Sequence, residues 1–180
     1  KVFAFFAKDQ EVKLLSRAKK EKFTGQKKHT FLVHLKDKVV IILGLGSVRK
    51  LTPEDWRETT ALATAFLKNY QAKNIGIIAN QWLQGSHDVE GLAQSLAEGL
   101  LLSSYRFDKY KKIDKQIIQI NIDNFYVELG KEKKQSFLKS WAIGHWQASG
   151  AILARDLVNE PANVMTPTYL AEVAKNIAKG

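Results

Sequence analysis

Residues that could form a metal or nucleophilic site are few and scattered in this chain. The four histidines (His29, His34, His87 and His145) form no helical pair four residues apart, and there is no cysteine. A metal site needs His, Asp and Glu clustered at workable spacing. The carboxylates stand mainly at expected helix starts or among lysines, where capping and solvation explain them. The residues alone therefore assign no catalytic and no metal-ligating position.

One glycine-rich stretch is a candidate phosphate-binding turn. "GLGS" (44–47) leaves an apolar run, as phosphate-binding loops do. A dinucleotide fingerprint would place a third glycine at Arg49 and start a helix at once, but the next helix is expected only after Thr52. We favour a strand-exit turn, with a phosphate cradle as the alternative.

The positive charge of the chain is concentrated in one segment. Of the net charge of +10, residues 13–50 carry +9, because they hold eleven Lys and Arg against two acids. One interpretation is a solvated loop and sheet edge kept soluble by lysine. The other is a phosphate or nucleic-acid surface. Its candidate contacts are Lys19, Lys20, Lys22, Lys27 and Lys28.

A second basic stretch, "YRFDKYKK" (105–112), interleaves aromatic and basic residues, as binders of single-stranded nucleic acid do. It also ends an expected helix, where aromatic side chains are buried and cations suit the helix dipole. We favour the structural interpretation and keep the binding one as the alternative.

These candidates must be positioned by alternating strands and helices. Thr52, Pro53 and Asp55 form a strong helix start, and the helix is expected to run to about Tyr70. The lysine-rich stretch 17–29 is expected to be a loop or exposed edge. The order of elements predicts an α/β sandwich with a parallel or mixed sheet. Strands are expected at 1–7, 30–35, 38–46, 74–79 and 116–122, and a second helix at 87–105.

The pattern changes near Lys131 to one long helical period that Pro161 ends. A helix of about 28 residues would span roughly 42 Å. Its length, its tryptophans and its cluster of small residues favour a connector between domains, closely approached by a partner, over one wall of a small core. Residues 161–165 are expected to be an irregular link, and Thr166 with Pro167 to start another helix.

Three segments together are similar to one known family. "ARDLVNEPANVMTPTYLAEVA" (154–174) closely resembles the segment that joins the two domains of the leucyl (cytosol) aminopeptidases, which are two-metal exopeptidases. "AEGLLLSSYRFDKYKK" (97–112) resembles a second landmark of this family. "VVIILGLG" with "LTPEDWRETTALATAFLK" (39–68) is similar to its strand, glycine turn and helix. The landmarks follow the family's order and cover most of the chain.

The resemblance implies a three-layer, macro-domain-like α/β sandwich with a central mixed sheet, followed by a long linking helix. It divides the chain into an N-terminal domain (1–130), the linking helix (131–160) and the start of a catalytic domain (161–180). In this family the catalytic domain supplies all ligands of two divalent ions, manganese or zinc, and the catalytic Lys and Arg. Its signature around "NTDAEGRL" does not occur here. No catalytic residue is carried over, and the chain alone is expected to be inactive.

The family also implies partners and a compartment. We expect a cytoplasmic protein, without a membrane span, in which this domain contacts its own catalytic domain and sister subunits of a homohexamer. Peptides with N-terminal leucine-like residues would bind the catalytic domain. DNA binding through 13–50, and an ADP-ribose-like ligand at 44–47, are the alternatives. The residues expected at the linker and interface are Trp141, Trp146, Ile152, Arg155, Asn159, Pro161 and Asn163.

Overall fold

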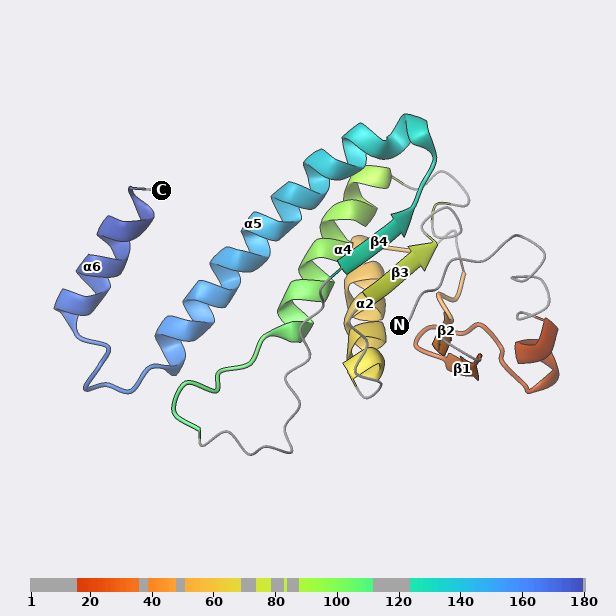
Figure 1. The fold of residues 1–180 in the computed structure, drawn as a ribbon, viewed down its shortest axis with the longest axis horizontal. Helices are drawn as coiled ribbons and strands as arrows, with labels where there is room; N and C mark the ends of the chain where they lie inside the picture. The colour runs from red at the N-terminus through yellow and green to blue at the C-terminus, as the bar shows by residue number, and fades with distance from the viewer. Residues whose placement is uncertain are drawn as a thin grey trace.

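The computed structural model of the chain describes residues 16–35, 39–47, 51–68, 74–78, 83, 88–111 and 124–179. The expected strands at 1–7 and 116–122 lie outside these residues. The described part has a mixed α/β fold, in which three helices lie side by side next to short strands (Figure 1). Its elements are β1 (Thr30–His34), β2 (Val39–Leu43), α2 (Pro53–Lys68), β3 (Asn74–Ile78), α4 (Val89–Ser104), β4 (Asn124–Glu128), η2 (Lys131–Lys133), α5 (Lys134–Asn159) and α6 (Pro167–Ile177).

The strands β1 and β2 form an antiparallel pair, in which Leu32 faces Ile41. The glycine turn 44–47 follows β2 directly. Gly46 has φ 71°, a left-handed conformation that favours glycine. The lysine-rich stretch before β1 is not wholly a loop, because residues 16–20 are helical. Ala18 is fully buried there while Lys19 and Lys20 stay exposed, so this short helix has one inward-facing position among its lysines.

The helix α2 begins at the predicted cap. The Thr52 backbone N–H donates to Asp55 Oδ2 at 2.8 Å, and the Asp55 N–H donates to Thr52 Oγ1 at 3.3 Å, which makes a reciprocal capping box. Trp56 and Leu67 are buried, whereas Leu62 and Phe66 are half-buried. The spacing of apolar residues therefore predicts the inner face of this helix correctly.

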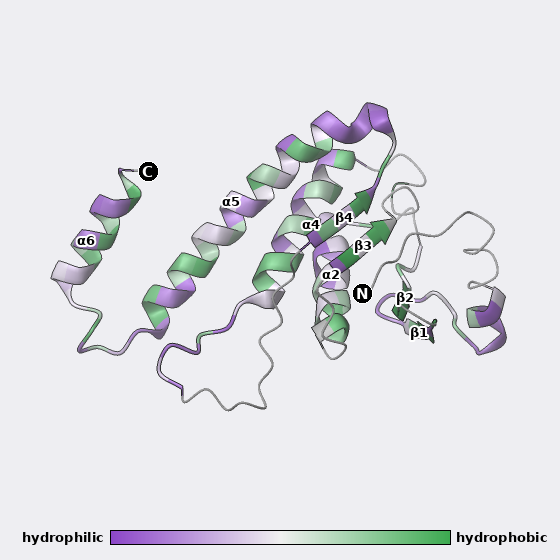
Figure 2. Cartoon of the chain, in the orientation of Figure 1, coloured by the Kyte–Doolittle hydropathy of each residue, from purple (hydrophilic) through white to green (hydrophobic). Residues whose placement is uncertain are grey.

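The strands β3 and β4 run parallel, with Ile75 paired to Phe125. Figure 2 shows both strands as mainly hydrophobic. The sequence pattern did not predict β4. It has only five residues, polar at both ends (Asn124 and Glu128), with the short run of Phe125, Tyr126 and Val127 between them. The two pairs are separate two-stranded sheets among the described residues.

The helix α4 lies between α2 and α5 (Figure 1). Its buried side is rich in small and aliphatic residues, from Leu92 to Leu100. Gly99 lies against the backbone of Arg57 in α2, and Gly144 lies against the backbone of Gln94 in α4. Two close helix–helix contacts, both made possible by glycine, therefore fix the order of the three helices.

The main core lies where α2, α4 and the first half of α5 meet. Trp56, Leu92, Leu96 and Phe137 are buried together. A second cluster joins Leu67, Ile75 and Leu100, with Ile41 and Phe125 packed against it. Trp141 contacts both clusters. The helix α5 therefore belongs to the packed body of the domain from Phe137 to Ala148, and its last turns lead to the hinge.

Candidate functional site

The candidate site is the hinge between α5 and α6. The Glu160 N–H closes the last turn of α5 on the Asp156 carbonyl oxygen at 3.1 Å. The carbonyl of Pro161 then accepts hydrogen bonds from the backbone N–H groups of Val164 and Met165, each at 2.9 Å. Residues 161–165 form a tight irregular link. The ring of Pro161 ends the long helix that precedes it.

The new helix α6 starts as its sequence predicts. The Thr166 hydroxyl accepts a hydrogen bond from the Tyr169 N–H at 3.2 Å, and Pro167 occupies the first helical turn. None of the residues of α6 is buried. Its apolar side chains at Leu170 and Ile177 are 50% and 61% exposed. The start of this helix is therefore set by local signals, and its contact with the rest of the described chain is limited to half-buried side chains such as Tyr169 and Val173.

The loop after α4 contacts the end of α5 through one tyrosine. The Tyr105 hydroxyl donates to Asp156 Oδ1 at 2.8 Å, and Asn159 Nδ2 donates to the Tyr105 oxygen at 3.2 Å. The guanidinium of Arg155 lies 5.6 Å from the centre of the Tyr105 ring. Burial and the hydrogen bond to Asp156 both raise the pKa of Tyr105. The phenol therefore stays neutral and acts as a donor.

A second contact closes the same loop on the hinge itself. Lys109 Nζ lies 2.5 Å from Glu160 Oε1, and the Tyr110 hydroxyl donates to the other carboxylate oxygen. Hydrogen bonds from Lys109 and Tyr110 hold the pKa of Glu160 below its ordinary value, and the hydrogen bond to Glu160 raises the pKa of Lys109. We call the contacts of Tyr105, Lys109 and Tyr110 with Asp156, Asn159 and Glu160 the hinge latch.

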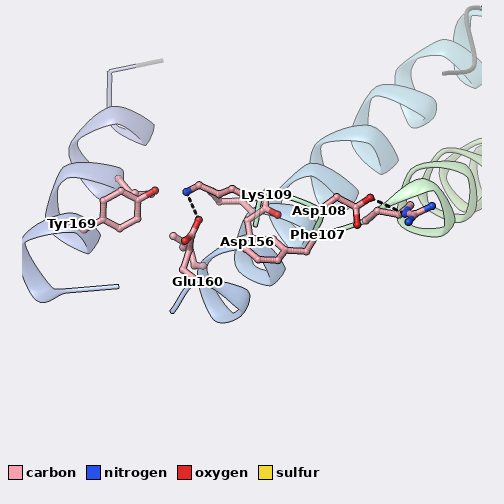
Figure 3. A pocket seen from close by; sticks show the side chains of 10 residues that line it. Phe107, Asp108, Lys109, Asp156, Glu160 and Tyr169 are labelled. Carbon is pink, nitrogen blue, oxygen red and sulfur yellow. Dashed lines mark hydrogen bonds and ion pairs between the residues drawn. The ribbon is translucent and has the colours of Figure 1, made fainter. Parts of the chain in front are cut away.

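A pocket of about 380 Å³ lies between the hinge latch, α5 and α6. Figure 3 shows Tyr169 pointing from α6 towards Lys109 and Glu160. Apolar side chains from all three segments share its lining: Phe107, Leu153, Leu157 and Val173. Its charged residues are satisfied inside the chain, since Arg106 and Lys111 pair with Asp108, and Lys109 pairs with Glu160. The pocket thus has a neutralised rim and an apolar lining.

The residues predicted for the linker and interface occupy three different surroundings. Trp141 stacks on Phe125 and Phe137, with ring centres 5.0 and 5.9 Å apart, inside the domain. Trp146 is 70% exposed, and Ile152 is half-buried. The other predicted residues lie at the hinge: Arg155 and Asn159 contact Tyr105, while Pro161 and Asn163 are exposed in the link.

The basic candidates are exposed, and two of them are paired. The side chains of Lys19, Lys20, Lys22, Lys27 and Lys28 all face solvent. Lys27 Nζ lies 2.6 Å from Asp55, and Lys28 Nζ lies 3.0 Å from Glu58, both on α2. Burial raises the pKa of Asp55, but hydrogen bonds from Lys27 and Thr52 outweigh it and lower that pKa. The acidic side of α2 thus neutralises part of the basic segment.

The glycine turn uses its donors inside the protein. The Gly44 N–H donates to the His29 carbonyl at 2.7 Å, and the Gly46 N–H donates to the Gly25 carbonyl at 2.9 Å. A side chain at Gly44 would collide with the backbone of Gln26. These glycines permit a close backbone crossing, and the two amide donors that a phosphate cradle would need are already bonded.

Within the described ranges, no three His, Asp or Glu side chains come together in a group that could hold a metal ion. His145 is exposed on α5. No helix among those residues has the length and apolar character needed to span a bilayer. The described part of the chain thus offers no ligand set for the two divalent ions that the family resemblance implies.

Sequence reasoning missed the hinge latch. The aromatic and basic residues of 105–111 and the acids Asp156 and Glu160 were visible, but Lys109 and Glu160 stand 51 positions apart. The charges are complementary, since Asp156 and Glu160 stand at the end of the long helix and residues 105–111 are mainly basic. Nothing in the pattern shows that the two segments meet.

The fold and hinge define a class of protein: an α/β domain whose last helix leads through a proline-stopped hinge into a helix that this domain does not cover. The model of the cytosol aminopeptidase family, N-terminal domain, matches residues 4–114. The chain belongs to this family, as its N-terminal domain. It is 36% identical over 159 residues to a probable cytosol aminopeptidase of Clostridium tetani, covering 87% of this chain and 32% of that protein. It is 32% identical over 163 residues to one of Alkaliphilus oremlandii, with 88% and 32% covered.

Solved structures show the same likeness. A mutant of tomato leucine aminopeptidase superposes with a TM-score of 0.75 at 26% identity, over 95% of this chain and 34% of that chain. The bottromycin maturation enzyme BotP in complex with Mn gives 0.72 at 21% identity, over 99% and 34%, which is a likeness of fold. The chain spans about a third of the length of the curated relatives it matches. These relatives are named as aminopeptidases or as a maturation enzyme, and none of the names supports DNA binding.

Proposed function

We propose that this chain is the non-catalytic N-terminal domain of a larger metallo-aminopeptidase that releases N-terminal leucine-like residues from peptides. The observation that carries the proposal is the family match over residues 4–114 together with the share of the relatives that is covered, about a third. A hinge and an uncovered α6 are what a junction with a second domain requires. The domain's role is to support assembly and to shape access to the active site.

The two divalent ions, manganese or zinc, belong in this proposal to the catalytic domain. When bound, such ions activate a water molecule and polarise the scissile carbonyl group. The described residues of this chain supply no ligand group of three, so no step of the reaction is assigned to them. Support for a metal comes from a relative in fold, the bottromycin maturation enzyme BotP, whose structure was solved in complex with Mn. The chain alone is therefore expected to be inactive.

The proposed architecture extends the described fold. We assign residues 1–130 to a three-layer, macro-domain-like sandwich, 131–160 to the linking helix and 161–180 to the start of the catalytic domain. Ile41 of β2 packs against the cluster that contains Ile75 of β3, which supports one central mixed sheet containing both strand pairs. The linking helix then has two parts, one packed on α4 and one that carries the hinge.

We further propose that the whole protein is a cytoplasmic homohexamer in which this domain contacts its own catalytic domain and sister subunits. The relatives are named as cytosol aminopeptidases, which supports the compartment. Trp146 is 70% exposed on α5, which supports its assignment to a contact surface. Arg155, Asn159, Pro161 and Asn163 are assigned to the junction, because they lie at or beside the hinge.

The test compares the 180-residue chain with the longer polypeptide that contains it. Both are supplied with Mn²⁺ or Zn²⁺ and assayed for release of leucine from a leucyl anilide and from a leucine-initiated peptide. We expect turnover by the longer polypeptide only, with loss of activity on chelation. Metal-dependent turnover by the 180-residue chain, or none by the longer polypeptide, would overturn the proposal.

A further inference from the structure

A loop of residues 22–29 crosses the glycine turn that follows β2, and we call it the crossing loop. The Gly46 N–H donates to the Gly25 carbonyl at 2.9 Å, and the Gly44 N–H donates to the His29 carbonyl at 2.7 Å. The two backbones approach so closely that a side chain at Gly44 would collide with the loop. The crossing loop therefore closes directly on the turn and occupies its amide donors.

The backbone of the crossing loop is held in an unfavourable conformation. Lys22 and Lys28 both have φ 66°, in the left-handed region that residues other than glycine seldom adopt. Lys22 follows the short helix 16–20, and Lys28 stands in the turn that the His29 N–H closes on the Gln26 carbonyl at 3.0 Å. Such residues persist only where surrounding contacts fix them. The closed loop thus depends on its specific side-chain contacts, and the loss of one of them favours release.

The side chain of His29 supplies one of these contacts. Its Nδ1 accepts a hydrogen bond from the Thr24 backbone N–H at 3.2 Å and lies 3.0 Å from the Thr24 hydroxyl oxygen. The ring is half-buried and lies against Phe23, with ring centres 5.0 Å apart. A backbone N–H only donates, so Nδ1 must keep its lone pair. The closed loop therefore requires the neutral imidazole that carries its proton on Nε2.

Protonation of His29 removes this acceptor. The imidazolium ion has an N–H at both ring positions, so rotation of the ring cannot restore a lone pair towards Thr24. The hydroxyl of Thr24 can reverse its role and accept a hydrogen bond, but the backbone N–H cannot. Two donors then face each other inside the loop, and the unpaired backbone N–H must turn to water. Protonation thus favours an open loop.

The charges around His29 act in the same direction. The acids of the short helix and of α2 are already paired with other cations: Glu21 with Arg17, Asp55 with Lys27, Glu58 with Lys28, and Glu54 and Glu98 with Arg57. The side chains of Lys19, Lys20 and Lys22 face solvent. A positive charge on His29 would therefore add to those of three lysines in the same loop, and like charges repel.

We propose that the crossing loop is a pH-sensitive closure of the glycine turn, closed by neutral His29 and released by protonation of His29. This closure does not depend on the proposed function. Imidazole side chains change charge between about pH 5 and 8. Because the closed loop requires the neutral ring, it is complete at the upper end of this range and is lost as the pH falls through it.

One anchor of the crossing loop stays in place over the same range. Lys27 Nζ lies 2.6 Å from Asp55 Oδ1 on α2. Burial raises the pKa of Asp55, but hydrogen bonds from Lys27 and Thr52 bring it below its ordinary value of 3.8. This ion pair is therefore lost only in stronger acid. The release is local, and its main consequence is that the Gly46 amide loses the Gly25 carbonyl.

The test follows amide hydrogen exchange of the 180-residue chain by NMR between about pH 7.5 and pH 5. Each rate is compared with that of an unstructured peptide at the same pH, which gives a protection factor free of the intrinsic pH dependence of exchange. We expect the protection of Thr24 and Gly46 to fall at least about tenfold, while that of Leu96, buried in α4, stays constant. The fall should coincide with the titration of the His29 ring, followed on the same sample.

Two substitutions separate the acceptor from the charge. In His29→Asn the side-chain oxygen stands in for Nδ1 and does not titrate, so Gly46 should stay protected over the whole range. In His29→Phe the acceptor is missing at every pH, so Gly46 should exchange quickly throughout. His34→Asn, at the exposed end of β1, is the matched control and should respond like the wild type.

Constant protection of Gly46 while the His29 ring titrates would overturn the inference. An equal fall in His29→Asn would do the same, because another group would then be responsible. An equal fall at Leu96 would also overturn it, because the whole domain would then be unfolding. If neither variant of His29 folds, the wild-type titration still decides, since the loss of protection and the titration of the ring either coincide or do not.

Discussion

Gly144 of α5 lies so close to the backbone of Gln94 in α4 that a Cβ added to it would come within 3.0 Å of three Gln94 backbone atoms. The contact is reinforced from the side, where Gln94 Nε2 donates to Gln147 Oε1 at 2.6 Å. Real Cβ atoms do not approach a backbone this closely, so the two helix axes could not keep this spacing with any other residue at 144. The glycine sets the helix spacing.

We predict opposite effects of alanine at two glycines of α5. Gly144→Ala should lower the free energy of unfolding by about 1–3 kcal/mol, because it overpacks the contact with α4. Gly150→Ala, where nothing lies within 4 Å of the added carbon, should raise it by about 0.5–1 kcal/mol. Urea unfolding followed by circular dichroism measures both. Equal effects of the two substitutions would show that α5 does not pack on α4 in solution.

The two threonine caps give a second prediction. Thr52→Ala removes the capping box of α2 and should cost about 0.5–2 kcal/mol of global stability. Thr166→Ala removes the same kind of cap from α6, which buries no residue. It should leave the midpoint of the main urea transition unchanged. It should only reduce the helical circular dichroism signal at urea concentrations below that transition. A shift of the main transition by Thr166→Ala would mean that α6 unfolds together with the domain.

Local chemistry made the caps and the long helix predictable. Thr52, Pro53 and Asp55 specify a helix start within four residues, and Pro161 specifies an end without any tertiary contact. The strand β4 was not predictable in this way. Its stability comes from pairing with β3, in which Tyr126 faces Gly76, and a pairing partner 50 residues away leaves no local pattern.

In the candidate site, too, features encoded locally were predictable and features that depend on tertiary packing were not. The sequence located the hinge and its irregular link, because proline and a threonine cap are local signals. It did not reveal the hinge latch, since Tyr105 and Asp156 meet only when α4 and α5 are packed together. The small residues in the middle of α5 favour the close approach of a partner to a connector between domains. At Gly144 the close neighbour is instead α4 of the same domain.

The hinge latch should make the free energy of unfolding depend on pH. Because the folded pKa of Glu160 is lowered, its ionised form is favoured by folding, and this contribution is present at neutral pH and lost as pH falls below the ordinary glutamate value of 4.5. Glu160→Gln should therefore destabilise the hinge at neutral pH, with a difference from the wild type that shrinks in acid. Thermal unfolding between neutral and acid pH measures it. A difference that stays constant across this range would argue against the ion pair.

The last prediction tests whether α5 is a wall of the core as well as a connector. Phe137 is 5% exposed and stacks on Trp141, whereas its neighbour Leu138 is 54% exposed. Phe137→Ala should cost about 3–5 kcal/mol, because it leaves a cavity beside Leu92 and Leu96. Leu138→Ala should change stability by less than about 0.5 kcal/mol. If α5 only linked two domains, the two substitutions would be equally mild in the 180-residue chain. A large, selective loss at Phe137 instead means that the first part of the linking helix is part of the domain's own core.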